Sequence, residues 1–406
     1  MNNKKKHLLV LNNGSSSLKF TVYEYDNKGV GKITIDGSYS GYNTGAVLVY
    51  RDYGKKLQKS YPVKYSLKSA WQAVVTIFAN LEIQTVGIRV VHGGPEFKAS
   101  CKLDKKTIHR ISKYNHLAPL HNVQSLEQAR LVQTTWPRVT IVASFDTAWY
   151  ADLEPEAYLY SLPVRYCEKF NIRKYGFHGL SHEMACAYAA EKTGVSVSKL
   201  SAITLHLGSG CSISWLEKGR VKDTSMGFSP NEGLTMATRS GDLPVAVVMY
   251  LAKELKMSWE EIDVLINKKS GLLGLFGSDD LREVLTAAGY KIAGYKSAPR
   301  YSAGQKKLAR QALAVYVYDI RRYLASYLGM SANPQAVVFT GVVGMNSAII
   351  RKLVLKNMRL PKNCRVLIAP EGEMINIAQK TWKYIRRVKN TSNSQSKKGN
   401  KVIGNR

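Results

Sequence analysis

Short apolar runs that end at turns rich in glycine and serine set the pattern of this sequence. The apolar run at residues 7–12 precedes such a turn, and residues 19–25 after it are rich in aromatic and β-branched side chains. These two segments predict strands joined by a turn. Residues 203–220 repeat the plan of apolar run, turn and alternating run. Two copies of one plan, far apart in the chain, predict two domains of similar design.

The turn of the first copy, GSSSLK at residues 14–19, contains three serines and one lysine. It lacks the GxxxxGK[ST] pattern and the following helix of a Walker phosphate loop. A hairpin tip can still bind phosphate through backbone N–H groups, hydroxyls and a lysine. The residues alone therefore leave a phosphate loop and an ordinary polar hairpin open. A third glycine-containing stretch, residues 337–354, predicts a strand, a loop and a helix whose N-terminus would suit a nucleotide.

Length and composition describe a globular protein large enough for two domains. The chain has 406 residues, of which 45% are hydrophobic and 10% aromatic, and this content supports buried cores. The longest apolar run, residues 245–252, is far shorter than the roughly 18 residues of a membrane span. The apolar run near the start is too short for a signal peptide. We therefore expect a cytoplasmic protein that does not enter a membrane.

Charge is the unusual feature of the composition. There are 59 Lys and Arg residues against 29 Asp and Glu residues, which gives a formal net charge of +30 and favours association with polyanions. One dense basic segment, residues 380–406, contains no acidic residue, and we expect residues 389–406 to be a disordered basic tail. A general basic bias explains the charge more simply than a nucleic-acid partner, which would bind through non-specific charge alone. The five cysteines form no CxxC pair, so neither a disulfide framework nor a zinc site is predicted.

Five polar stretches combine histidine, aspartate or arginine with glycine or proline more densely than ordinary loops do. The sequence has neither the GxSxG turn of a serine hydrolase nor the HExxH helix of a zinc protease, so those classes have no support. The five stretches are GIRVVHGG at residues 87–94, HLAPLHN at 116–122, SFDTAWY at 144–150, RKYGFHGLSH at 173–182 and DTSMGFSPNEGLTMATRSGD at 223–242.

Taken together, these motifs resemble those of the acetate and butyrate kinase family, in the superfamily of sugar kinases, heat-shock chaperones and actin. The similarity runs from about residue 8 to residue 378 and rests on the ordered set NNGSSSLK, RVVHGG, LAPLHN, FDTA, YGFHGLSH, DTSMGFSPNEGL, TRSGD, NKKSGLLG and VVFTG. It implies an α/β protein of two similar domains, with a duplicated ribonuclease-H-like core as in actin-like ATPases and an active-site cleft between the domains. The expected N-terminal domain comprises residues 1–147 and about 374–388, a C-terminal helix that returns to it. The expected nucleotide-binding domain comprises residues 148–373.

The reaction that the resemblance implies is the reversible transfer of a phosphoryl group from ATP to acetate, giving acetyl phosphate and ADP. It would depend on Mg²⁺ or Mn²⁺, and family members are typically homodimers. An acyl carboxylate, with a pKa of about 4, is already ionised at neutral pH. It therefore needs no general base, and the protein has to place it in line with the γ-phosphoryl group and neutralise charge. Arginines, a histidine and the metal ion would do this.

The resemblance also assigns roles to single residues. Arg89 and Arg239 would bind the carboxylate and the transferring phosphoryl group, and His178 would steady that group. Asp146, Asn12 and Glu373 would lie at the metal ion. The acetate methyl pocket would be formed by Val91, Leu120, Phe177 and Pro230. The expected contacts with the nucleotide and its phosphates are Ser15, Ser17, Lys19, His121, His206, Leu207, Gly208, Ser209, Gly210, Asp280, Leu281, Arg282, Gly341, Val342, Val343, Gly344 and Asn346.

The chain departs from the family pattern most at the edge that would bind the base. Ser209 replaces an asparagine in the second hairpin, and Met345 replaces a glutamate in the nucleotide loop. Val342 replaces a glycine. A β-branched residue is strained where φ must be positive, and its methyl groups would narrow an adenosine pocket.

Three functions therefore stay open. The first is an ATP-dependent acetate kinase. The second is a kinase of the same fold that uses pyrophosphate as donor, which a blocked adenosine pocket would favour, or propionate or butyrate as acceptor. The third is a non-catalytic polyanion-binding relative, against which the intact residues Arg89, Asp146, His178, Arg239 and Glu373 argue.

Overall fold

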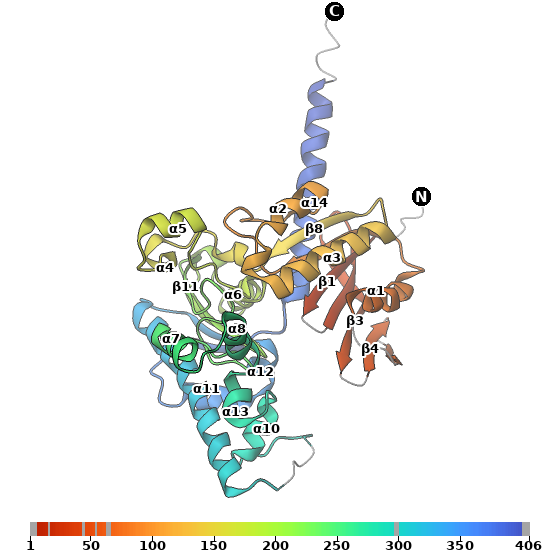
Figure 1. Ribbon diagram of the computed structural model, residues 1–406. Coiled ribbons are helices and arrows are strands. Elements are labelled where there is room, and N and C mark those ends of the chain that lie inside the picture. The colour runs from red at the N-terminus through yellow and green to blue at the C-terminus, as the bar shows by residue number, and fades with distance from the viewer. Residues whose placement is uncertain are drawn as a thin grey trace, which may run out of the picture. The chain divides into compact units, whose positions relative to one another are not determined.

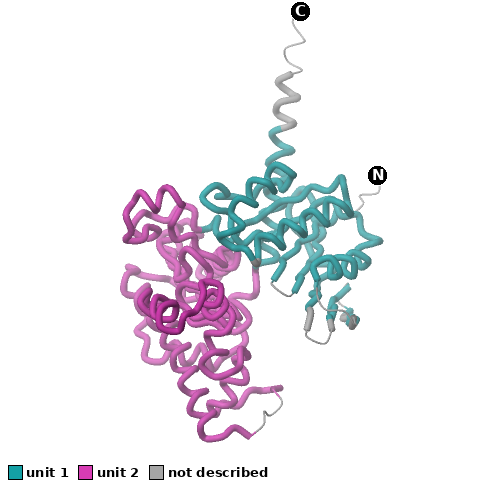
Figure 2. Tube along the Cα trace, viewed as in Figure 1, with its two compact units in different colours: residues 1–149, 373–406 teal, residues 150–372 magenta. Residues whose placement is uncertain are grey.

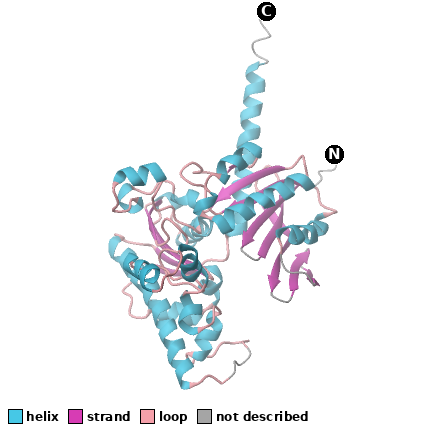
Figure 3. Ribbon diagram, viewed as in Figure 1, coloured by secondary structure: helices cyan, strands magenta, loops and turns pink. Residues whose placement is uncertain are grey.

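The computed structural model describes residues 6–14, 17–42, 45–52, 55–61, 66–295 and 300–399. These residues form a mixed α/β protein with two sheets (Figures 1 and 3). The chain divides into two units (Figure 2): unit 1 comprises residues 1–149 and 373–406, and unit 2 comprises residues 150–372. Within the described ranges, no helix is both long enough and apolar enough to span a membrane.

Unit 1 is built on a sheet with the strand order β5-β4-β3-β2-β1-β6-β8-β7. Strands β1 to β5 form an antiparallel meander, whereas β6 and β8 run parallel to β1. The first predicted hairpin is confirmed, because β1 and β2 pair up to Gly14 and Ser17. The strands are β1 Lys6–Gly14, β2 Ser17–Tyr25, β3 Val30–Tyr42, β4 Gly45–Asp52, β5 Lys55–Tyr61, β6 Ile83–Val90, β7 Cys101–Lys102 and β8 Thr140–Phe145.

Unit 2 repeats this plan on a smaller sheet, with the order β11-β10-β9-β12-β13. Strands β9, β10 and β11 are antiparallel neighbours, and β12 and β13 run parallel to β9. Order and directions match those of β3-β2-β1-β6-β8, so the predicted duplication of the core is confirmed. The strands are β9 Ala202–Leu207, β10 Cys211–Glu217, β11 Arg220–Thr224, β12 Ala336–Thr340 and β13 Arg365–Ile368.

Each sheet is covered by a long helix from a different part of the chain. Helix α6, Gly179–Thr193, packs on β9 and β12, and helix α14, Glu373–Gly399, packs on β1, β6 and β8. The sequence predicts disorder from residue 389, but α14 continues as a helix to Gly399, so that expectation is wrong over this part. Residues 400–406 lie outside the described part of the chain.

Several of the remaining helices begin at polar residues whose side chains accept hydrogen bonds from backbone N–H groups of the first turn. Ser66, Asp104, Ser258 and Ser302 cap helices α1, α2, α8 and α11 in this way. These helices are α1 Leu67–Val75, α2 Lys105–Ser112, α3 Pro119–Thr135, α4 Pro155–Tyr158, α5 Val164–Phe170, α7 Val245–Glu254, α8 Trp259–Lys268, α9 Gly271–Phe276, α10 Leu281–Ala287, α11 Ala303–Met330, α12 Gly341–Asn346 and α13 Ala348–Leu355.

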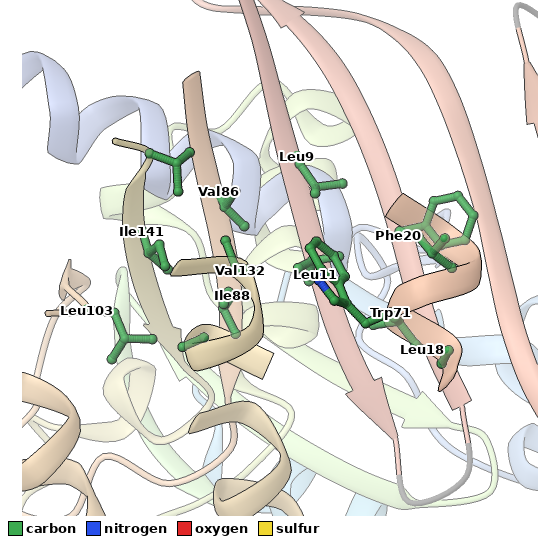
Figure 4. Close-up of a cluster of buried hydrophobic side chains, with 14 of the residues drawn as sticks. Leu9, Leu11, Leu18, Phe20, Trp71, Val86, Ile88, Leu103, Val132 and Ile141 are labelled. Atoms are coloured by element: carbon green, nitrogen blue, oxygen red, sulfur yellow. The ribbon is translucent and has the colours of Figure 1, made fainter. Parts of the chain in front are cut away.

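The core of unit 1 determines which strand residues face the other side of its sheet. Leu9 and Leu11 of β1 and Val86 and Ile88 of β6 point into one apolar cluster with residues of α1 and α3 (Figure 4). Side chains alternate along a strand, so the neighbours of these residues point to the opposite face. On that face α14 approaches closely, since a Cβ atom on Gly87 would lie 2.5 Å from Oγ1 of Thr381.

Candidate functional site

Four polar side chains of unit 1 meet where the parallel strands β1, β6 and β8 end. Asn12 lies near the end of β1, Arg89 near the end of β6, and Asp146 directly follows β8. Carboxyl ends of parallel strands lie at one edge of a sheet, where ligands of α/β proteins commonly bind. Arg89 comes two residues after Gly87 and so shares the face that α14 covers. Glu373 is the first residue of that helix.

The guanidinium of Arg89 is the centre of this cluster. Its Nε and Nη2 donate to Oδ1 and Oδ2 of Asp146 at 2.9 and 2.5 Å, and Nε lies 3.2 Å from Oε1 of Glu373. Its Nη1 donates to Oδ1 of Asn12 at 3.1 Å, while Nδ2 of Asn12 donates to Oε2 of Glu373 at 2.6 Å. Together these contacts form a closed network of a cation, two carboxylates and an amide.

Burial makes this network strongly coupled. The side chain of Asp146 is fully buried, and those of Arg89 and Glu373 are 16% and 12% exposed. Burial by itself would lower the pKa of Arg89, but the charges of Asp146 and Glu373 outweigh it and raise that pKa above its ordinary value. Arg89 is therefore a permanent cation that offsets the two carboxylates.

The same oxygen atoms suit a hard divalent cation. Mg²⁺ prefers oxygen ligands and is usually held by one or two protein carboxylates together with waters and substrate phosphates. Among the described residues no group of three His, Cys, Asp or Glu side chains could hold a metal by itself. Asp146 and Glu373, with the amide oxygen of Asn12, fit such a shared site.

The β1–β2 hairpin places one more cation beside this cluster. Lys19 of β2 stands directly opposite Asn12 of β1 in the antiparallel register, and Ser17 stands opposite Gly14. The predicted strand–turn–strand therefore puts Lys19 on the strand next to the ion-paired residues. Ser15, which the sequence also predicts at this site, lies outside the described residues.

Two loops of unit 1 contribute neighbouring residues. Val91, one residue beyond β6, is buried, and His121 lies in the first turn of α3 and is half-buried. The side chain of Leu120 lies outside the described part. The side chain of Asn122 accepts from the backbone N–H of His92 at 3.0 Å and donates to its carbonyl at 2.9 Å. This tie joins the two predicted motifs RVVHGG and LAPLHN.

Unit 2 carries a cluster of three histidines around the start of α6 and the β9–β10 hairpin. His178 precedes α6 with a left-handed φ of 56°, and its ring lies 4.3 Å from that of His206 on β9. Oγ of Ser181 lies 2.8 Å from Nδ1 of His206. Oγ of Ser212 lies 2.8 Å from Nδ1 of His178 and 2.7 Å from Nε2 of His182.

Arg239 reaches the same hairpin. A Cβ atom on Gly210 would lie 3.2 Å from Nε2 of His178 and 3.3 Å from Nη2 of Arg239, so both groups lie against a residue that has no side chain. Nη1 of Arg239 donates to the carbonyl of Pro230 at 2.7 Å. The ring of Phe177 is fully buried. Unit 2 therefore brings His178, His206, Gly210, Arg239 and Pro230 together.

The nucleotide loop of unit 2 corrects one expectation. The residue with positive φ is Gly341, at 76°, and a Cβ atom there would lie 2.6 Å from the carbonyl oxygen of Leu207. Val342 does not have positive φ. It lies inside α12 as a residue that is 58% exposed, and Nδ2 of Asn346 donates to its carbonyl at 2.9 Å. The expected strain at Val342 is therefore wrong, because the turn is made one residue earlier.

The other predicted nucleotide residues lie on three further parts of unit 2. Asp280 caps α10 and pairs with Arg282 at 2.7 Å, and that guanidinium lies 5.3 Å from the ring centre of Tyr295. Leu281 is buried in the first turn of α10, and Val343 and Gly344 belong to α12. Gly208 and Ser209 form the β9–β10 turn, where the Gly208 N–H donates to the Gly210 carbonyl at 3.0 Å.

Comparison with known proteins decides the family. The acetokinase family matches residues 7–362. The chain belongs to this family. It is 36% identical to an acetate kinase of Coprothermobacter proteolyticus, over 86% of each chain, and 35% identical to an acetate kinase of Thermosipho africanus, over 94% of this chain and 98% of that one. The resemblance drawn from the motifs is thereby confirmed.

Solved structures of a propionate kinase and an acetate kinase share the fold. A propionate kinase from Francisella tularensis subsp. tularensis SCHU S4 matches with a TM-score of 0.82 at 31% identity, over 93% of this chain and 99% of that one. An acetate kinase from Porphyromonas gingivalis matches with a TM-score of 0.79 at 30% identity, over 94% and 100%. The chain is therefore an enzyme of the kinase class, as the sequence predicts.

Sequence reasoning singled out His182, at the end of the motif at residues 173–182, but missed Ser212 and Thr204, whose hydroxyl groups contact it. Ser212, His182 and Thr204 are fully buried and linked by hydrogen bonds. A serine or threonine on a buried strand carries no motif of its own. The one available signal is the repeated hairpin, because Ser212 lies two residues after Gly210 in the predicted second turn.

Proposed function

We propose that the protein transfers the γ-phosphoryl group of ATP to acetate, reversibly, giving acetyl phosphate and ADP. The observation that carries this proposal is the buried network of Arg89, Asp146, Glu373 and Asn12 at the carboxyl edge of the sheet, in a member of the acetokinase family. A permanent cation there can bind a carboxylate or phosphoryl oxygen. The two acidic side chains beside it can share a metal ion with phosphate.

The acetate needs positioning and charge neutralisation, because its carboxylate is already the nucleophile. We assign Arg89 and Arg239 to hold the carboxylate and the equatorial oxygens of the transferring group, since a guanidinium offers paired donors that match both. Val91, Phe177 and Pro230 would receive the methyl group, together with Leu120.

Charge on the transferring group is spread over its oxygen atoms, so donors aimed at those atoms lower the barrier most. His178 and Arg239 both lie against Gly210, and we assign them to this role, with His206 and His121 nearer the phosphates. Asp146, Glu373 and Asn12 would hold the metal ion, Mg²⁺ or Mn²⁺. Such an ion would supply positive charge that offsets the charge of the phosphates.

The nucleotide would lie along the two hairpins and the α10 and α12 segments. Gly341 lets α12 begin against the Leu207 carbonyl, and the exposed Val342 and Asn346 follow it. Ser15, Ser17 and Lys19 would contact phosphate from the first hairpin. We assign Asp280 and Arg282 to the adenosine. A homodimer in the cytoplasm stays a prediction.

Propionate is the second candidate acceptor, because a propionate kinase is among the structures with this fold. Pyrophosphate loses one argument in its favour, since Val342 is not strained and its methyl groups are largely exposed. A lower KM for ATP in Val342→Gly would mean that these methyl groups still narrow the nucleotide site.

The deciding experiment is acyl-phosphate formation with Mg²⁺, trapped as the hydroxamate. Acetate, propionate and butyrate are each combined with ATP and with pyrophosphate, and mixtures without donor serve as blanks. Turnover with ATP and acetate supports the proposal, and the ratio of kcat/KM values ranks the acids. Turnover with pyrophosphate but not with ATP would mean that pyrophosphate is the phosphoryl donor. No turnover with any mixture, in protein shown to be folded, would reject the proposal in favour of a non-catalytic relative.

A further inference from the structure

A buried series of hydrogen bonds lies behind His178. Its Nδ1 is 2.8 Å from Oγ of Ser212, and the same oxygen is 2.7 Å from Nε2 of His182. Nδ1 of His182 is in turn 2.7 Å from Oγ1 of Thr204. Ser212, His182 and Thr204 are all 0% exposed. Because solvent does not reach these side chains, their hydrogen-bond partners determine which atom of each carries a proton.

The single hydroxyl proton of Ser212 couples the two histidines. A serine hydroxyl donates once and can accept, so if Ser212 donates to one imidazole it accepts from the other. The far end gives the direction. Oγ1 of Thr204 donates to the carbonyl of Ser214 over a long 3.5 Å, so it accepts from Nδ1–H of His182. This leaves Nε2 of His182 to accept the Ser212 proton.

The neutral state of His182 agrees with this order. Burial, and then the nearby His206, hold the pKa of His182 well below its ordinary value. A neutral imidazole has one donor and one acceptor nitrogen. With Nδ1 as its donor, His182 accepts from Ser212, and the oxygen of Ser212 is left to accept Nδ1–H of His178.

We propose that Ser212 and His182 are positioning residues that keep the proton of neutral His178 on Nδ1, so that His178 binds and releases protons only at Nε2. That nitrogen lies against Gly210, 3.2 Å from the place of a Cβ atom there, and Nη2 of Arg239 lies 3.3 Å from the same place. The inference deepens the proposed function and rests on it for its meaning. A proton bound at Nε2 would make His178 a donor to the transferring phosphoryl group, while Ser212 accepts from Nδ1 throughout.

The test reads the tautomer directly and does not need activity. Histidine labelled with ¹³C and ¹⁵N is incorporated into the full chain, and the His178 signals are assigned by their loss in His178→Gln. Neutral His178 should carry its proton on Nδ1 in the wild type and lose this preference in Ser212→Ala. Ser201→Ala is the matched control, because Ser201 is a buried serine like Ser212. Its oxygen, however, accepts from the backbone N–H of Lys218 at 3.1 Å and contacts no histidine in that bond. It should leave the tautomer unchanged.

Kinetics separate positioning from simple structural support. Loss of a group that orients a site residue costs roughly 10- to 100-fold, so kcat should fall by this factor in Ser212→Ala with little change in either KM. Ser212→Thr, which keeps the hydroxyl, should recover part of kcat. A wild-type proton on Nε2, or an unchanged His178 tautomer in Ser212→Ala, would overturn the inference. An inactive wild type with the proton on Nδ1 would instead reject the proposed function and leave the tautomer assignment standing.

Discussion

The two units place different chemistry at corresponding positions of two sheets that share one plan. Asn12 of β1 stands opposite Lys19 of β2, and His206 of β9 stands opposite Ser212 of β10 in the same antiparallel register. Unit 1 surrounds its position with a cation and two carboxylates. Unit 2 surrounds its own with imidazoles and hydroxyls. The duplicated fold therefore fixes where polar groups lie, and the side chains decide what they do.

The difference extends to the central parallel pair of each sheet. In unit 1 the pairing of β6 with β1 ends at Ile88, but Arg89 is still in the strand and pairs with Ser144 of β8. In unit 2 Thr340, which pairs with His206 of β9, is the last strand residue. Gly341 then starts α12 at the point where β6 has one more strand residue. One copy thus ends in a buried ion-pair network and the other in a turn that frees backbone N–H groups.

Arg89→Leu tests whether charge pairing holds unit 1 together. Removal of the guanidinium leaves the buried carboxylates of Asp146 and Glu373 without their cation. Breaking a buried ion pair typically lowers the free energy of unfolding by about 3–5 kcal/mol. Urea unfolding without metal should show this loss. Arg51→Leu removes the exposed ion pair of Arg51 with Asp36, 2.7 Å apart, and should change stability little because exposed pairs are screened. Equal effects of the two substitutions would mean that the network does not stabilise the unit.

Arg239→Ala tests whether the unit 2 cluster serves catalysis rather than folding. Nη1 of Arg239 donates to the Pro230 carbonyl, which is a neutral acceptor, so loss of this contact leaves no buried charge behind. A lost donor to the transition state lowers kcat by on the order of 10²–10³. We expect this loss with nearly unchanged urea unfolding, and partial recovery in Arg239→Lys, which keeps the charge but not the paired donors. A kcat close to that of the wild type would remove Arg239 from the mechanism.

Gly341→Ala tests the turn after β12, which unit 2 has and unit 1 lacks at the corresponding strand end. The new Cβ would sit 2.6 Å from the Leu207 carbonyl oxygen at a φ of 76°. Gly194 has nearly the same φ, 74°, with nothing within 4 Å, so Gly194→Ala measures the backbone cost alone, about 1–2 kcal/mol. Gly341→Ala should cost roughly 1–3 kcal/mol more through overpacking, and should raise the KM for ATP. Equal unfolding free energies of the two variants would show that the close approach carries no cost.

Sequence patterns predicted the hairpins, the duplicated core and the family, because glycine turns, strand alternation and ordered motifs are local features. They did not predict the closed network around Arg89, since it joins residues from both ends of the chain. The strain assigned to Val342 was wrong for a related reason. A substitution pattern indicates that one position is unusual, but only the backbone shows that Gly341 makes the turn.

The smallest effect, a dependence of stability on pH, should come from one buried histidine in each unit. Burial lowers the pKa of His92 in unit 1 to about 3, with His116 adding to this, and lowers that of His182 in unit 2 well below its ordinary value. Both stay neutral in the folded protein, whereas unfolded histidine binds a proton below about pH 6.5. The unfolded state then holds more protons, so the free energy of unfolding falls as pH decreases from 6.5.

Each histidine should contribute up to about 1.4 kcal/mol per pH unit to this fall, and nothing above pH 7.5. Urea unfolding at pH 7.5, 6.5 and 5.5 measures how the free energy of unfolding changes with pH. His92→Gln and His182→Gln should each reduce this slope by the contribution of one proton. If only His92→Gln flattened the slope, His182 would be protonated in the folded state. The histidine cluster of unit 2 would then carry charge, and its contrast with the ion-paired cluster of unit 1 would be lost.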